Sequence, residues 1–158
     1  DASVHIMETG LTISNGLGWS LDLKTMYLTD TLRRVIYAYD FDQASGAIDR
    51  RRVFVDSSNE AGYPDGMTVD NEGGVWSARW GGWMVTRYDP AGKVEREIRL
   101  PVECPTSCAF GGEGLNELYI TSAWTALTDE QRRQQPQAGD VFRLAMDIKG
   151  RAPWKFAG

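Results

Sequence analysis

The chain has 158 residues, of which 42% are hydrophobic and 25% are charged, a balance typical of one globular domain with a sizeable core. Its formal net charge of −5 argues against electrostatic binding to nucleic acid or to an acidic membrane surface. No apolar run approaches the roughly 18 residues that a transmembrane helix needs, and residues 1–10 lack the basic and apolar blocks of a signal peptide.

Short strand patterns then follow one another along the chain, separated by clusters of Gly, Asn, Asp and Pro. The strands are predicted at 25–30, 35–42, 51–56, 67–70, 74–79, 84–90, 94–100, 107–112, 117–123 and 140–145. This spacing, with turn residues between the strands, predicts an all-β sandwich, barrel or propeller. Residues 129–139 break the pattern, because they are polar and contain Pro136 and Gly139, which favour a loop with at most a helical turn.

An internal repeat selects the propeller among these architectures. The segment that starts at ISNGLGW aligns with the segment that starts at YPDGMTV, so that Gly16 matches Gly66 at an offset of 50 residues. The two copies also share a strand that ends in Tyr-Asp, at Tyr39 and at Tyr88. A looser third copy starts at PTSCAFGG, where Ser107 takes the place of Gly66. Four-stranded repeats of about 40–50 residues are typical of propeller blades.

The repeat predicts about three blades, which is too few to close a ring. We expect the end of a preceding blade at 1–12 and blades at 13–60, 61–102 and 103–158, the last with a long loop at 125–139. Propellers typically have four to eight blades, since closure protects the strand edges. Two alternatives follow: the chain is part of a larger propeller, or two copies associate about a two-fold axis into a six-bladed ring.

Three segments in order, ISNGLGWSLDLKTMYLTDT, YPDGMTVDNEGGVWSARWGGWMVTRYDP and LPVECPTSCAFGG, give the chain a resemblance to the SMP-30/gluconolactonase/regucalcin family. Members of that family are six-bladed propellers that bind one divalent cation and hydrolyse sugar lactones. The resemblance covers nearly the whole chain and implies the C-terminal part of such a propeller. It therefore implies a metal-dependent lactonase that is incomplete, or inactive, without an N-terminal half.

The resemblance also implies two metal ligands. The family holds its cation with a Glu from near its N-terminus, the Asn of an SNG motif and the Asp of a PDG motif, and the last two match Asn15 and Asp65. The inner strand of each blade starts at the channel mouth, so Asn15 and Asp65 would converge there and offer the oxygen donors that hard cations prefer. The Glu has no counterpart, since Glu8 lies in a segment interpreted as an outer strand. Thr106-Ser107 replaces a carboxylate in the third copy.

In the mechanism that the resemblance implies, Asp65 is both a metal ligand and the catalytic base, and Asn15 is a neutral ligand. The cation would be Ca²⁺, Zn²⁺, Mn²⁺ or Mg²⁺, and the substrate a sugar lactone. An alternative is a non-catalytic half-propeller that binds or scaffolds and that self-associates. The alternative to a role as ligand and base is that Asp65 is purely structural. It would then only form a Pro-Asp-Gly turn, in which Pro64 presets φ and Gly66 accepts a positive φ.

Other conspicuous side chains are expected to be structural. We expect Trp76, Trp80 and Trp83 to pack between blades rather than to stack on a sugar, and Asp40 and Asp89 to serve turns. Nothing in the sequence gives Arg79 a role, although it could reach the channel. Cys104 and Cys108 are predicted to be free thiols in a reducing compartment, which indicates a cytoplasmic location.

Overall fold

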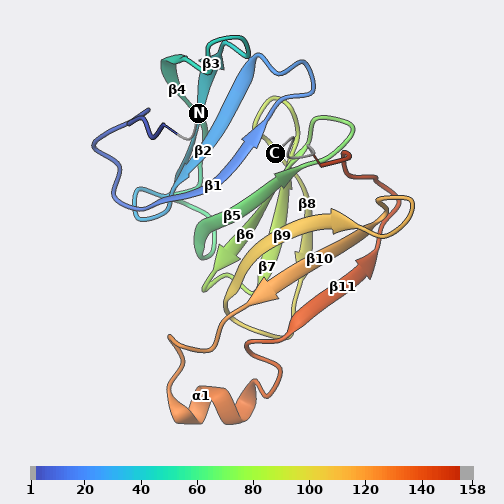
Figure 1. The fold of residues 1–158 in the computed structure, drawn as a ribbon. Coiled ribbons are helices and arrows are strands. Elements are labelled where there is room, and N and C mark those ends of the chain that lie inside the picture. The colour runs from blue at the N-terminus through green and yellow to red at the C-terminus, as the bar shows by residue number, and fades with distance from the viewer. Residues whose placement is uncertain (1–2, 154–158) are drawn as a thin grey trace.

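The computed structural model describes residues 3–153, which form three antiparallel sheets in sequence order (Figure 1). The first sheet contains β1 (Ser14–Trp19), β2 (Thr25–Asp30), β3 (Val35–Phe41) and β4 (Ile48–Asp56). The second contains β5 (Tyr63–Val69), β6 (Val75–Trp80), β7 (Met84–Tyr88) and β8 (Val94–Arg99). The third contains β9 (Pro105–Gly111), β10 (Glu117–Ser122) and β11 (Val141–Ala145). This arrangement confirms the predicted all-β partial propeller.

Two apolar cores hold the three sheets together. Tyr27, Ile36 and Val55 of the first sheet pack against Met67 and Val75 of the second. A second cluster joins the second and third sheets, and its members are Trp76, Ala78, Val85, Leu100, Val102, Cys108, Leu118, Ile120 and Ile148. The middle strands of the first two sheets bury side chains on both faces. β10 of the third sheet buries Leu118 and Ile120 on one face only, so that sheet is covered on one side, as in a stack of blades that ends there.

The first strands of the three sheets, β1, β5 and β9, lie side by side. A Cβ added to Gly16 would come 2.6 Å from the carbonyl oxygen of Asp65 and 2.8 Å from the backbone nitrogen of Met67. A Cβ added to Gly66 would come 2.5 Å from the Cβ of Ser107. Neither glycine has a positive φ. The two glycines are therefore required by the close approach of the inner strands and not by a turn.

The Pro-Asp-Gly motif lies inside a strand, which corrects the turn interpretation. β5 begins at Tyr63, and its pairing with β6 shifts register between Pro64 and Met67, so that Asp65 and Gly66 form a bulge. β1 shifts in the same way between Ser14 and Leu17. A bulge keeps a strand continuous while it re-aims the extra residue, and this explains how a Pro and a Gly are accommodated within an inner strand.

The third sheet carries the equivalent irregularity. Pro105 pairs with Ser122 and Ser107 pairs with Thr121, so Thr106 is the extra residue of β9. The bulges of β1, β5 and β9 thus fall at Asn15, Asp65 and Thr106, the three positions that the repeat aligns. All three lie near the start of an inner strand and at the same end of the three sheets (Figure 1).

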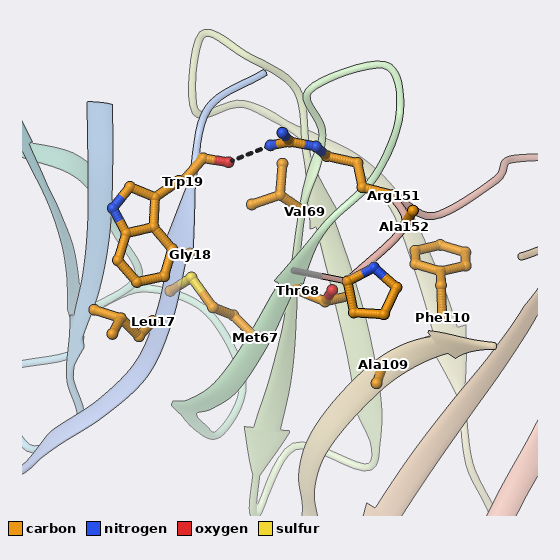
Figure 2. A pocket seen from close by; sticks show the side chains of 11 residues that line it. Leu17, Gly18, Trp19, Met67, Thr68, Val69, Ala109, Phe110, Arg151 and Ala152 are labelled. Atoms are coloured by element: carbon orange, nitrogen blue, oxygen red, sulfur yellow. Dashed lines mark hydrogen bonds between the residues drawn. The ribbon is translucent and has the colours of Figure 1, made fainter. Parts of the chain in front are cut away.

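The segment that follows β11 crosses the opposite end of all three sheets. Gly150 donates its N–H to the Leu115 carbonyl at 2.7 Å and bridges Asp70, while the Arg151 Nη1 donates to the carbonyls of Trp19 and Ser20 at 3.3 and 3.0 Å. Figure 2 shows Arg151 reaching the Trp19 carbonyl beside a cavity of about 230 Å³ that residues of β1, β5 and β9 line. This segment therefore links the three sheets at that end.

For two segments the structure departs from the prediction or makes it more specific. Residues 3–12 form no strand, although the end of a preceding blade was expected there. Residues 129–139 do hold a helical turn, α1 (Asp129–Gln134), because Thr128 and Gln131 form a reciprocal capping box. Within residues 3–153 no helix combines the length and the apolar character that crossing a membrane requires.

Candidate functional site

The predicted residues Asn15 and Asp65 line the same open pocket, of about 430 Å³. It lies at the bulged ends of β1 and β5, so the two bulges aim the two side chains at one space. The remaining lining residues are Ile13, Thr31, Leu32, Tyr63 and Trp80. The Asn15 and Asp65 oxygens are thus set, with the hydroxyl of Thr31, among apolar and aromatic groups, an arrangement typical of small-molecule sites.

The environment of Asp65 favours its protonated form. Burial raises the pKa of the Asp65 carboxyl to about 6, against the opposing effects of a hydrogen bond from the Asn15 side chain and one from the Gly66 N–H. No positively charged side chain among the described residues contributes to this shift. A half-buried carboxylate without a neighbouring cation is able to bind a metal ion, or to accept a proton near neutral pH.

The donors of this pocket fit part of a metal coordination shell. The Asn15 amide oxygen and the Asp65 carboxylate are hard donors of the kind that Ca²⁺ and Mg²⁺ take, but Ca²⁺ takes about six to eight oxygens. Residues 3–153 contain no group of three or more His, Cys, Asp or Glu side chains placed to hold a metal. Further donors would have to come from hydroxyl or backbone oxygens of this chain, from water, from a ligand or from other protein.

Neither of the two further positions considered from the sequence supplies a donor to this pocket. Glu8 lies 3.5 Å from Arg51 Nη1 and accepts a hydrogen bond from the Thr9 N–H. Thr106 shares a 2.7 Å hydrogen bond with the hydroxyl of Thr121 and is not among the lining residues. The third bulge therefore retains its position in the repeat without contributing an oxygen to the pocket.

Tyr63 and Trp80 also line the pocket, although the sequence analysis did not consider Tyr63 and expected Trp80 to pack between blades. They face each other across the β5–β6 ladder, and Tyr63 lies two residues before Asp65. Strand alternation would have predicted Tyr63 beside Asp65 if β5 had been predicted to begin at Tyr63. Trp76, by contrast, is fully buried against Phe110, so its predicted packing role is confirmed.

The other residues that were expected to be structural differ in outcome. Trp83 is exposed instead of packed between blades. The Asp89 carboxylate accepts the N–H groups of Ala91 and Lys93 at 2.9 Å and closes the β7–β8 turn. Asp40 lies within β3 and forms ion pairs with arginines of β4 instead of serving a turn. Cys104 and Cys108 are free and buried, as predicted.

Comparison with known sequences identifies the family to which the chain belongs. The sequence model described as the SMP-30/Gluconolactonase/LRE-like region matches residues 1–124. The chain belongs to this family. A regucalcin from Gallus gallus is 44% identical over 148 residues, which are 92% of this chain and 50% of the relative. The chain thus spans about half the length of the curated relatives it matches.

Solved structures of the family agree with the fold. A luciferin-regenerating enzyme superposes with a TM-score of 0.86 at 35% identity over 95% of this chain and 50% of its own. A calcium-binding protein, regucalcin, from Agrobacterium tumefaciens gives a TM-score of 0.85 at 34% identity over 89% of this chain and 48% of its own. A gluconolactonase from Xanthomonas campestris gives 0.61 at 32% identity over 72% of this chain and 36% of its own.

Proposed function

We propose that this chain provides two of the cation ligands, and the catalytic base, of a sugar lactonase propeller. The observation that carries the proposal is the convergence of Asn15 and Asp65, from equivalent bulges of two neighbouring sheets, on one pocket. Membership of a family whose solved members include a gluconolactonase and a calcium-binding protein supports it. The remaining donors would come from the substrate, from water or from the part of the relatives that this chain does not cover.

A bound divalent cation would polarise the lactone carbonyl and lower the pKa of a bound water. In the proposal, Asn15 and Asp65 would hold the cation, and the Asp65 carboxylate would also accept the proton of the attacking water. The pKa of about 6 is that of Asp65 without a cation, and a bound cation would lower it, so that the carboxylate would be ionised and able to accept a proton at neutral pH. Asn15 donates a neutral oxygen that leaves the positive charge of the site undiminished, while Tyr63 and Trp80 provide a wall against which a lactone ring can lie.

Calorimetric titration of the 158-residue chain with Ca²⁺, Zn²⁺ and Mn²⁺, followed by pH-stat measurement of gluconolactone opening, tests this proposal. We expect one cation to bind per chain. Cation-dependent opening of the lactone supports the lactonase over a non-catalytic module. Binding without opening supports Asn15 and Asp65 as ligands and is expected if the activity needs the part of the relatives that this chain does not cover. The absence of binding to all three cations at millimolar concentration would contradict the assignment of Asn15 and Asp65 as ligands.

Cation affinity should fall as the pH is lowered through about 6. Burial raises the pKa of Asp65 to about 6, and its carboxyl must lose its proton to bind a cation. Below that pH, each unit should weaken the affinity by about tenfold as protons compete with the cation. Dissociation constants measured from pH 4.5 to 8 check this expectation. A constant affinity across that range would show that the cation binds elsewhere.

A further inference from the structure

The segment that leads into β5 is held by a fully buried arginine of β6. The Arg79 Nε donates to the carbonyl oxygen of Ala61 at 3.1 Å, and its Nη2 donates to the carbonyl oxygen of Gly62 at 3.1 Å. Arg79 also pairs with Pro64, the residue before Asp65, across the β5–β6 ladder. One guanidinium therefore fixes the backbone just before the proposed ligand and base.

Two further side chains fix Arg79 itself. Its Nη1 lies 3.3 Å from the hydroxyl of Tyr88, and that hydroxyl donates to the Glu60 Oε2 at 2.5 Å. The same Glu60 oxygen lies 3.7 Å from the Arg79 Nη2. Burial raises the pKa of Tyr88 well above its ordinary value, so its hydroxyl keeps its proton. A buried guanidinium is costly unless it has such partners, and here all three groups satisfy one another.

The first sheet contributes a second arginine to the same segment. The Arg34 Nη2 donates to the Gly62 carbonyl at 2.7 Å and to the Glu60 carbonyl at 3.1 Å. Gly62 has a φ of +69°, and a Cβ there would come 2.5 Å from the Gly82 nitrogen. Residues 60–62 are therefore held between two sheets in a conformation that only glycine allows at position 62.

We propose that Arg79, supported by Glu60 and Tyr88, is a positioning residue that aims Asp65 at the cation. None of the three lines the pocket, so they act through the backbone of residues 60–64. This inference rests on the proposed function, because the direction of Asp65 matters only if its carboxylate binds or reacts. Metal ligands depend on such outer contacts for their orientation, and the loss of one typically weakens affinity by about 10–100-fold.

The test compares Tyr88→Phe and Arg79→Met with Tyr39→Phe. Tyr39 is nearly fully buried and occupies the position of Tyr88 in the preceding copy of the repeat, but in the first sheet. Two measurements are made: the Mn²⁺ affinity by calorimetry, and the amide and carboxyl NMR signals of Asp65 without metal. We expect Tyr88→Phe to weaken Mn²⁺ binding by about tenfold and to shift the Asp65 signals. We expect Tyr39→Phe to do neither, even where its melting temperature falls equally.

The outcomes separate positioning from simple stabilisation. If Tyr88→Phe and Arg79→Met lower only the melting temperature, as the control does, then the network is structural and the inference is wrong. If Arg79→Met does not fold, Tyr88→Phe and Glu60→Gln decide the result. If the unmodified chain binds no Mn²⁺, the proposed function fails. In that case the Asp65 signals still show whether the network sets the position of the side chain.

Discussion

Replacing Asp65 with Asn is expected to weaken cation binding severely and, at neutral pH, to stabilise the fold. The variant keeps the shape of the side chain but removes the only carboxylate that lines the pocket within the described residues. A cation site built on this charge should lose at least about 100-fold in affinity, since the remaining donors are neutral. Calorimetric titration with Ca²⁺ or Mn²⁺ measures this loss.

The stabilisation follows from the direction of the pKa shift. Burial raises the pKa of Asp65 from 3.8 to about 6 in the folded chain, so the folded state holds this proton more tightly than the unfolded state does. The folded state therefore loses stability as the pH rises from about 4 to beyond 6, and this loss is complete at pH 7. The neutral Asn side chain avoids it. Because water partly screens the half-buried carboxylate, we expect a gain on the order of 1 kcal/mol.

Asp147 provides a control of the opposite sign. A hydrogen bond from Arg96 lowers the pKa of Asp147 to about 2, so its charge favours the folded state at neutral pH. Asp147→Asn should leave cation affinity unchanged and should not stabilise the chain. Urea unfolding at pH 7 and at pH 4 distinguishes the two variants. An Asp65→Asn protein that is less stable than the unmodified chain at pH 7 would contradict the assigned environment of Asp65.

Removing a buried charge is expected to stabilise a protein where that charge serves binding or catalysis and not folding. The carboxylate of Asp65 is partly removed from water, and the neighbouring side chains of Ile13, Leu32 and Trp80 carry no charge that would compensate for this. The same features that destabilise the ionised carboxylate would strengthen its electrostatic interaction with a cation. The proposed site and the local instability thus have one physical origin.

The sequence predicted the blades and the relation between Asn15 and Asp65, because a repeat records its own period. The spacing from Gly16 to Gly66 aligned two residues that the structure places on one pocket. The resemblance to a lactonase family, and not the repeat, gave those residues a proposed chemical role. Strand patterns also located most outer strands, since alternation of polar and apolar residues is a local property.

The inner strands were harder to predict, because the local preferences of their residues favour turns over strands. Pro64 and Gly66 are turn residues by local preference, yet the tight packing of β5 between β1 and β9 keeps them within a strand. The network of Glu60, Arg79 and Tyr88 joins three segments that are separated in sequence. No local pattern encodes such contacts, so only the folded arrangement reveals them.

Gly16→Ala is expected to destabilise the fold strongly, because its Cβ would enter the space occupied by β5. The new methyl group would come 2.6 Å from the Asp65 carbonyl oxygen and 2.8 Å from the Met67 nitrogen, and both are backbone atoms that cannot rotate away. Overpacking of this kind costs about 1–3 kcal/mol. Urea unfolding monitored by tryptophan fluorescence measures the loss, and a separation of β1 from β5 should also weaken cation binding, because it moves Asn15 away from Asp65.

Gly114→Ala provides the matched comparison. Gly114 is exposed, has no positive φ, and its added Cβ would meet first the Asn116 Oδ1, at 3.1 Å, which lies at the end of a side chain that can move. Alanine there should be neutral or stabilise by about 0.4–1 kcal/mol, since it restricts the unfolded chain. The difference between the two variants isolates the contact between inner strands from the general effect of replacing glycine. Equal stabilities would mean that β1 and β5 can separate at no cost, and the convergence of Asn15 and Asp65 would then lose its structural basis.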